Sequence, residues 1–167
     1  DFLTLVSQIR KTLPNVGLST DIIVGFPGEN LNEWRESYDF IDELNISGLH
    51  VFPFSARQGT RAAEFSDKVP AAQIRTRAAD LRCLGKQLQH AYAARFVGQT
   101  MEVLWEHRVR LPGEAQGSYR CLGYTPNYIS VCMEDAAPAL SVQPGGITSV
   151  TFETTDEQAT LWGRESG

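Results

Sequence analysis

The spacing of apolar and polar positions predicts alternating helices and strands in the first part of the chain. Apolar stripes at helical spacing predict helices over residues 2–13 and 31–44. Short runs rich in β-branched and aromatic residues, 22–24 and 49–54, predict two buried strands. Helix, strand, helix, strand with short connections indicates βα units and a parallel sheet.

The pattern changes after a third helical stripe, which follows Val69-Pro70 and extends to residue 97. Beyond Gly98, five short runs of strand character are separated by proline and glycine turns: 101–106, 118–124, 127–132, 146–152 and 159–162. Five short strands in so small a segment predict an antiparallel barrel of the oligonucleotide-binding kind. The fold class is therefore α/β plus all-β, with domains 1–97 and 98–167.

Loops at the carboxyl ends of the two predicted strands are the first candidate site. Gly25, Pro27 and Gly28 end the first strand, and Asn30 or Asn32 can cap the helix that follows. If the strands are neighbours, both loops meet at one edge, where backbone amides and Arg57 can bind an anionic or polar ligand. Alternatively, Arg57 pairs with a surface carboxylate. His50 has no histidine or cysteine partner nearby in sequence and is interpreted as structural.

Composition and charge indicate which kinds of partner the chain can bind. No apolar run has membrane length, and the formal charge is −5. Between residues 71 and 97, however, five basic residues face one aspartate. This stripe is either a solvated helix face or a contact for a phosphate backbone. In the last segment the aromatic residues Trp105, Tyr119, Tyr124 and Tyr128 lie near Arg120 in a pattern that suits base stacking, although this segment is acidic.

The three cysteines, Cys83, Cys121 and Cys132, have no metal-knuckle or redox-pair spacing. We expect reduced, buried thiols, which favour a cytoplasmic location.

Residues 18–29 (LSTDIIVGFPGE) and 51–63 (VFPFSARQGTRAA), followed by an arginine-rich helix and a β-module, resemble the radical S-adenosylmethionine methylthiotransferases. Residues 123–131 (GYTPNYISV) resemble the branch that acts on N6-threonylcarbamoyladenosine in tRNA. The branches acting on isopentenyladenosine in tRNA or on a ribosomal protein stay open. So do a different radical or α/β cofactor-binding enzyme and a stand-alone RNA-binding module without catalysis.

The resemblance implies the C-terminal part of a partial (βα) radical SAM barrel followed by a TRAM domain. It implies S-adenosylmethionine and two [4Fe-4S] clusters in the full-length enzyme, tRNA as partner, and missing N-terminal domains of the same protein. No C-x-x-x-C-x-x-C triad is present. We therefore expect the isolated chain to bind no cluster or cofactor and to be inactive, and its truncated sheet edge to be open to self-association.

These expectations give two sets of candidate residues. The predicted cofactor-binding residues are Ile23, Val24, Gly25, Val51, Phe52, Pro53 and Phe54. The predicted RNA-binding residues are Arg57, Arg75, Arg82, Arg120, Tyr124, Asn127 and Tyr128.

Overall fold

The computed structural model describes residues 2–112, 118–135 and 142–166 and contains two compact units that divide within one long helix, between Gln89 and His90. The domain boundary at Gly98 stays a prediction. Elements of the first unit are α1 (Phe2–Thr12), β1 (Ser19–Val24), α2 (Leu31–Leu44), β2 (Gly48–Pro53), a 3₁₀ turn η1 (Arg61–Glu64) and most of α3 (Ala71–Ala94). Within the described residues, no helix is both long and apolar enough to cross a lipid bilayer.

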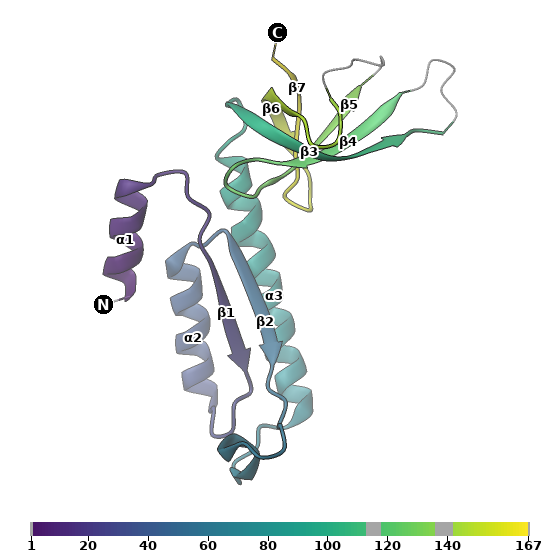
Figure 1. Cartoon of the computed structure of the whole chain (residues 1–167). Coiled ribbons are helices and arrows are strands. Elements are labelled where there is room, and N and C mark those ends of the chain that lie inside the picture. Colours follow the sequence, from purple (N-terminus) through teal and green to yellow (C-terminus); the bar gives the residue numbers. More distant parts are fainter. Residues whose placement is uncertain (1, 113–117, 136–141, 167) are drawn as a thin grey trace. The chain divides into compact units, whose positions relative to one another are not determined.

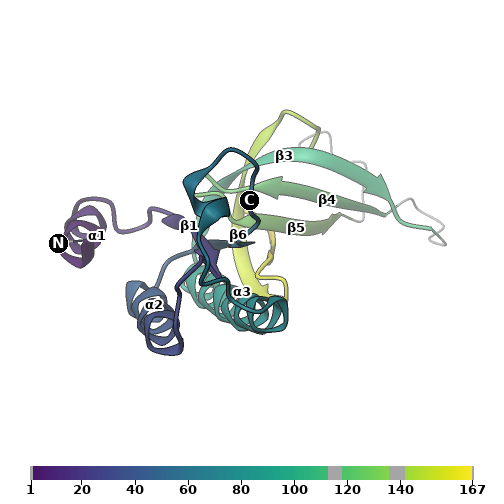
Figure 2. The ribbon, with the colours of Figure 1, turned by 90° about the horizontal axis from the view of Figure 1, so that it is seen from below.

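In the first unit, β1 and β2 form a two-stranded parallel sheet, as predicted (Figure 1). Ile22 and Val51 lie opposite each other and pack on a core shared with α2 and α3. Figure 2 shows α2 and α3 on the same side of this sheet. The prediction of two buried strands is wrong for the face with Ile23 and Phe52, which point away from that core and are 57% and 51% exposed.

Local signals in the sequence account for the ends of α2. Asn30 caps its N-terminus: the side chain accepts from the N–H groups of Asn32 and Glu33, and Glu33 returns a contact to the Asn30 N–H. Asn45 ends the helix in the left-handed conformation, with φ of 47°. The predicted bounds of this helix are confirmed.

The second unit is a closed barrel with the strand order β3-β4-β5-β7-β6. Its strands are β3 (Thr100–Arg110), β4 (Tyr119–Tyr124), β5 (Ser130–Asp135), β6 (Ile147–Thr155) and β7 (Leu161–Glu165). The five predicted strands are confirmed, but the barrel is mixed rather than antiparallel, because β5 and β7 pair in parallel. The parallel pairing follows from the order of the strands in the chain. β6 comes between β5 and β7 in the sequence and pairs with the edge of β7 that does not face β5.

Candidate functional site

The two parallel strands of the first unit end side by side and bring their following loops to one edge of the sheet. Val24 lies opposite Pro53, and the Phe54 N–H donates to the Val24 carbonyl at 2.8 Å. We call residues 25–29 and 54–57 the strand-end loops. The predicted neighbour relation of the two strands is confirmed.

Two glycines give the first strand-end loop its path. Gly25 and Gly28 have φ of +79° and +91°, in the region that favours glycine. A Cβ at Gly25 would overlap the side chain of Ile74 on α3, so only hydrogen fits there. The Gly28 N–H donates to the Asp67 carbonyl at 2.7 Å. The loop is therefore held against its neighbours on two sides.

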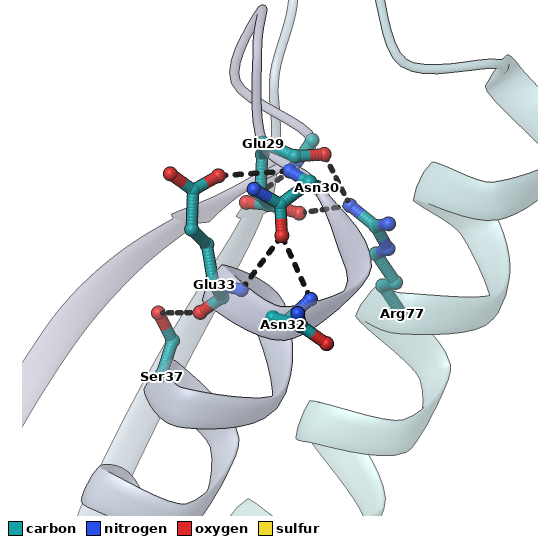
Figure 3. Close-up of polar contacts among 7 residues, drawn as sticks. Glu29, Asn30, Asn32, Glu33, Ser37 and Arg77 are labelled. Carbon is teal, nitrogen blue, oxygen red and sulfur yellow. Dashed lines mark hydrogen bonds and ion pairs between the residues drawn. The ribbon is translucent and has the colours of Figure 1, made fainter.

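A buried ion pair fixes the end of the same loop (Figure 3). Arg77 donates to the Glu29 carboxylate at 2.5 Å and to the Glu29 carbonyl at 3.1 Å. The other carboxylate oxygen accepts the Gly25 N–H at 3.0 Å. The two charged side chains are only 8% and 16% exposed. One carboxylate thus joins the start of the loop, its end and α3.

Burial of Arg77 changes the interpretation of the basic helix. Its guanidinium pairs with Glu29 and lies 5.9 Å from the centre of the Trp34 ring, so it is not available to a phosphate. Arg75 and Arg82 are exposed on α3. Arg82 also donates to the Val51 carbonyl at 3.5 Å, and the contact of these two residues with RNA stays a prediction.

The predicted cofactor-binding residues divide between the two faces of the sheet. Val24 is buried and Val51 packs on the same core, whereas Ile23 and Phe52 lie opposite each other on the exposed face. Phe54 packs edge-on against Phe26, with ring centres 5.3 Å apart. Gly25 is buried and Pro53 is exposed. The structure brings these residues together at the strand ends, and their role stays a prediction.

Two further features of the first unit bear on the predicted sites. Within the described residues, the exposed Arg57 side chain has no carboxylate within 4.0 Å, so its alternative role as a surface ion-pair partner has no support. A groove of about 370 Å³ lies between α1 and the end of α2 and includes Arg10 and Glu43. None of the predicted site residues lines it.

Strand alternation decides which aromatic residues of the barrel face outward. Trp105 is 1% exposed, and its indole N–H donates to the Thr148 hydroxyl at 2.8 Å. Tyr119 packs against the same barrel core. The prediction that Trp105 and Tyr119 form part of a stacking surface is therefore wrong. Side chains alternate between the two faces of a strand, and both residues occupy positions that face the inside of the barrel.

The outer face of β4 has Arg120, Leu122 and Tyr124, and an unpredicted tryptophan lies two strands away. Leu122 lies opposite Cys132 on β5, which lies opposite Trp162 on β7. Arg120 pairs with Glu134 at 2.6 Å and lies 5.6 Å from the centre of the Trp162 ring. The sequence signal that could have identified Trp162 as a surface residue is its outward-facing position in the alternating pattern of β7.

Asp156 holds the edge of the Trp162 ring. One carboxylate oxygen accepts the indole N–H at 2.9 Å, and the other accepts the N–H groups of Gln158 and Thr160. Burial raises the pKa of Asp156, but these hydrogen bonds lower it by more, so its pKa lies below the usual range.

Tyr128 projects from a tightly bonded turn between β4 and β5. It is 87% exposed and has φ of 62°, an uncommon value for an aromatic residue. Asn127 accepts from the Thr125 hydroxyl at 2.6 Å and donates to the Tyr92 hydroxyl at 2.8 Å. Tyr124 and Tyr128 have ring centres 6.4 Å apart. The structure thus brings together three of the predicted RNA-binding residues.

The thiols are not arranged as a metal site. All three cysteines are free, and Cys121 and Cys132 are buried as predicted. Burial raises the pKa of Cys132 to about 11. Cys83 is exposed, which corrects the prediction, because it lies on the solvent side of α3 between the buried Leu81 and Leu84. Among the described residues, no three histidine, cysteine or acidic side chains gather where they could hold a metal.

Comparison with known proteins places the chain in a family. It is 37% identical over 130 residues to threonylcarbamoyladenosine tRNA methylthiotransferase MtaB of Bacillus subtilis, covering 78% of this chain and 28% of that protein. It is 41% identical over 129 residues to a tRNA-2-methylthio-N(6)-dimethylallyladenosine synthase of Chloroflexus aurantiacus, covering 75% of this chain and 26% of that protein. A Corynebacterium jeikeium protein with the second name is 29% identical over 162 residues, covering 89% of this chain and 31% of that protein. No protein-family model matches the chain.

The chain belongs to the tRNA methylthiotransferase family, and the resemblance indicated by its motifs is confirmed. It spans about a quarter to a third of the length of these relatives.

Proposed function

We propose that the chain is part of a tRNA-modifying enzyme that adds a methylthio group to N6-threonylcarbamoyladenosine. The observation that carries the proposal is the 37% identity to the Bacillus subtilis protein over 78% of the chain. Within this proposal the first unit is part of the radical SAM barrel and the second is the TRAM domain, a closed five-stranded barrel suited to RNA. The proposed location is the cytoplasm.

The strand-end loops fit one side of an S-adenosylmethionine site. Ile23 and Phe52 offer exposed apolar side chains at the strand ends, which suit the faces of an adenine ring. Val24 and Gly25 support them from the buried side. The Gly25 N–H is engaged by Glu29 and serves the loop rather than the ligand. When bound, S-adenosylmethionine supplies the radical chemistry, and these residues orient it.

The residues described do not fit an iron–sulfur cluster, because they offer no group of three suitable ligands. We therefore assign no step through a cluster to this chain. Iron analysis and absorption spectra after anaerobic reconstitution test this point. A stoichiometric cluster on the isolated chain would contradict it.

The free edges of the two-stranded sheet suggest how the first unit is completed. Within the described residues, β1 and β2 pair only with each other, so each leaves one edge of backbone groups open. In the proposed enzyme, strands of the preceding domains of the same protein cover the β1 edge and the face around Ile23. In the isolated chain the same edge favours self-association, which size-exclusion chromatography over a range of concentrations measures.

A chimera tests the proposed activity and separates the two tRNA branches. The matched segment of the Bacillus subtilis protein is replaced by this chain in a strain lacking that protein, and tRNA nucleosides are analysed by mass spectrometry. We expect the methylthio derivative of N6-threonylcarbamoyladenosine to reappear. Its absence, with the dimethylallyladenosine derivative formed instead, would favour the alternative branch, which the 41% identity to the Chloroflexus aurantiacus protein supports.

RNA binding is tested on the chain itself. Filter binding of tRNA at two salt concentrations compares the unmodified chain with Arg75→Glu/Arg82→Glu. We expect weaker binding and a shallower salt dependence, since exposed arginines on α3 then no longer contact phosphates. Arg35→Glu, an exposed charge reversal on α2, is the matched control. Equal affinity in the double variant and the control would remove α3 from the RNA-binding surface.

A further inference from the structure

The turn between β4 and β5 requires Tyr128 to adopt a backbone conformation that a tyrosine side chain does not favour. The Tyr128 N–H donates to the Thr125 carbonyl at 2.9 Å, which closes a tight turn, and Tyr128 itself is left-handed, with φ of 62°. Glycine or asparagine normally occupies such a position. A tyrosine that is 87% exposed gains little burial in return. Strained residues of this kind gather at ligand sites.

The turn is also held by side-chain hydrogen bonds. The Ile129 N–H donates to the Thr125 hydroxyl at 2.9 Å, and that hydroxyl donates to the Asn127 side-chain oxygen. The Asn127 amide nitrogen donates to Tyr92, which is buried at the end of α3 within the same unit. Both ends of the Asn127 amide are engaged inside the protein. This residue is therefore suited to positioning the turn rather than to contacting RNA.

The geometry of the neighbouring ring points to a flat ligand. Tyr124 is the last residue of β4 and is 38% exposed, and its ring centre lies 6.4 Å from that of Tyr128 with the planes 46° apart. Stacked bases repeat about every 3.4 Å, so a base held between two rings needs ring centres about 7 Å apart. To stack on one base, the exposed Tyr128 ring must turn through the 46° between the two planes and move slightly away from Tyr124.

The barrel surface is apolar on the β3 side of Tyr124, whereas Ser130 lies opposite Tyr124 on β5. Leu104 lies opposite Tyr124 on the neighbouring strand, and Ile147 lies opposite Leu104 on the next. All three are exposed. On the same face of β4, Arg120 is already paired with Glu134. The site therefore favours the face of a base over a phosphate group.

We propose that Tyr124 and Tyr128 clamp one unpaired nucleobase of RNA, and that Asn127 positions Tyr128 through its hydrogen bond to Tyr92. This inference rests on the proposed RNA-binding function and adds the class of ligand and the site. It assigns the barrel a stacking contact that is largely independent of salt, distinct from the phosphate contacts proposed for α3.

The test uses this chain and a seven-nucleotide RNA with 2-aminopurine at its centre, single-stranded or annealed to its complement. Stacking on tyrosine quenches the fluorescence of 2-aminopurine, and anisotropy gives the affinity. We expect quenching with the single strand only. Tyr128→Phe retains affinity and quenching, because stacking needs the ring and not the hydroxyl.

Tyr128→Gly separates binding from folding. Glycine adopts the left-handed conformation readily, so the thermal midpoint stays equal or rises, while affinity for the single strand falls about tenfold or more. Ala159→Gly makes the same backbone change at another left-handed residue, with φ of 61°, and is the matched control. We expect it to leave RNA binding unchanged.

The positioning role of Asn127 is tested by a cycle of variants. Asn127→Ala and Tyr92→Phe each weaken quenching at saturating RNA. The double variant loses no more than Asn127→Ala alone, because both single variants remove the hydrogen bond to Tyr92 and only Asn127→Ala also removes the acceptor of the Thr125 hydroxyl. Full quenching and unchanged affinity in Tyr128→Gly would overturn the clamp and leave RNA binding in place. Failure of the unmodified chain to bind the single strand or tRNA would overturn both the clamp and the proposed RNA binding.

Discussion

Removal of Arg77 is the sharpest test of how the strand-end loops are held. Arg77→Met keeps an unbranched apolar stem but removes the guanidinium, and with it both the ion pair and the contact with the Trp34 ring. The Glu29 carboxylate, only 16% exposed, then keeps the Gly25 N–H as its remaining hydrogen-bond donor among those described. Breaking one partner of a buried pair costs about 3–5 kcal/mol, because the other charge stays buried.

Part of the lost stability should be recovered when the charge of Glu29 is also removed. In Glu29→Gln/Arg77→Met, the amide oxygen of the new glutamine can still accept the Gly25 N–H. No charge is then left buried, and we expect the double variant to lose only about 1–2 kcal/mol relative to the unmodified chain. Arg75→Met changes an exposed arginine on the same helix and should stay within about 0.5 kcal/mol.

The measurement must separate the two units, because a chain with two compact units need not unfold in one transition. Amide hydrogen exchange followed by mass spectrometry does so, comparing peptides from β1 and α2 with peptides from β6. We expect faster exchange in the first unit of Arg77→Met and unchanged exchange in the barrel. If Arg77→Met loses less than about 1 kcal/mol, or the double variant is as unstable as the single, the ion pair does not hold the loop.

Two further variants test local features of each unit. Gly25→Ala should destabilise the first unit by about 2–4 kcal/mol, since it adds left-handed strain and an overlap with Ile74, and Gly25→Ala/Ile74→Ala should recover part of this loss in the same exchange experiment. Because the pKa of Asp156 is lowered in the fold, the stability that it contributes is present above the pKa of the unfolded chain and is lost as pH falls through the lower folded value. Thermal melts of the barrel between pH 6 and pH 2 should show this acid-dependent loss in the unmodified chain and not in Asp156→Asn; parallel curves would contradict it.

Helices and strands were predicted correctly where residues close together in the sequence set their ends. The helix of residues 31–44 was predicted with its observed bounds because Asn30 and Asn45 are local end signals. The third strand was predicted too short. It continues to Arg110 past the polar Glu106 and His107, where a bulge shifts the register and interrupts the alternation on which the prediction depends.

Contacts between residues far apart in the sequence leave no local pattern from which they could be predicted. Glu29 and Arg77 are 48 positions apart, and a run of arginines does not show which member will be buried. The inward side of Trp105 and the outward side of Trp162 depend on the register of a closed barrel, which the pattern of a single strand does not determine. The predicted strand-end residues were brought together because parallel strands end at one edge.

Different interactions hold the loops of the two candidate sites. We therefore expect the two sites to respond differently to pH and salt. The strand-end loop depends on a buried charge pair between Glu29 and Arg77. The barrel turn depends on a neutral chain of hydrogen bonds that ends at Tyr92, and burial raises the pKa of that phenol despite the Asn127 hydrogen bond and nearby Arg95, which lower it. The phenol therefore remains protonated throughout the neutral range, and the Asn127 hydrogen bond does not change with pH there. Base stacking at Tyr128 should accordingly be insensitive to both pH near neutrality and salt, whereas the proposed contacts of Arg75 and Arg82 with phosphates weaken steeply with salt.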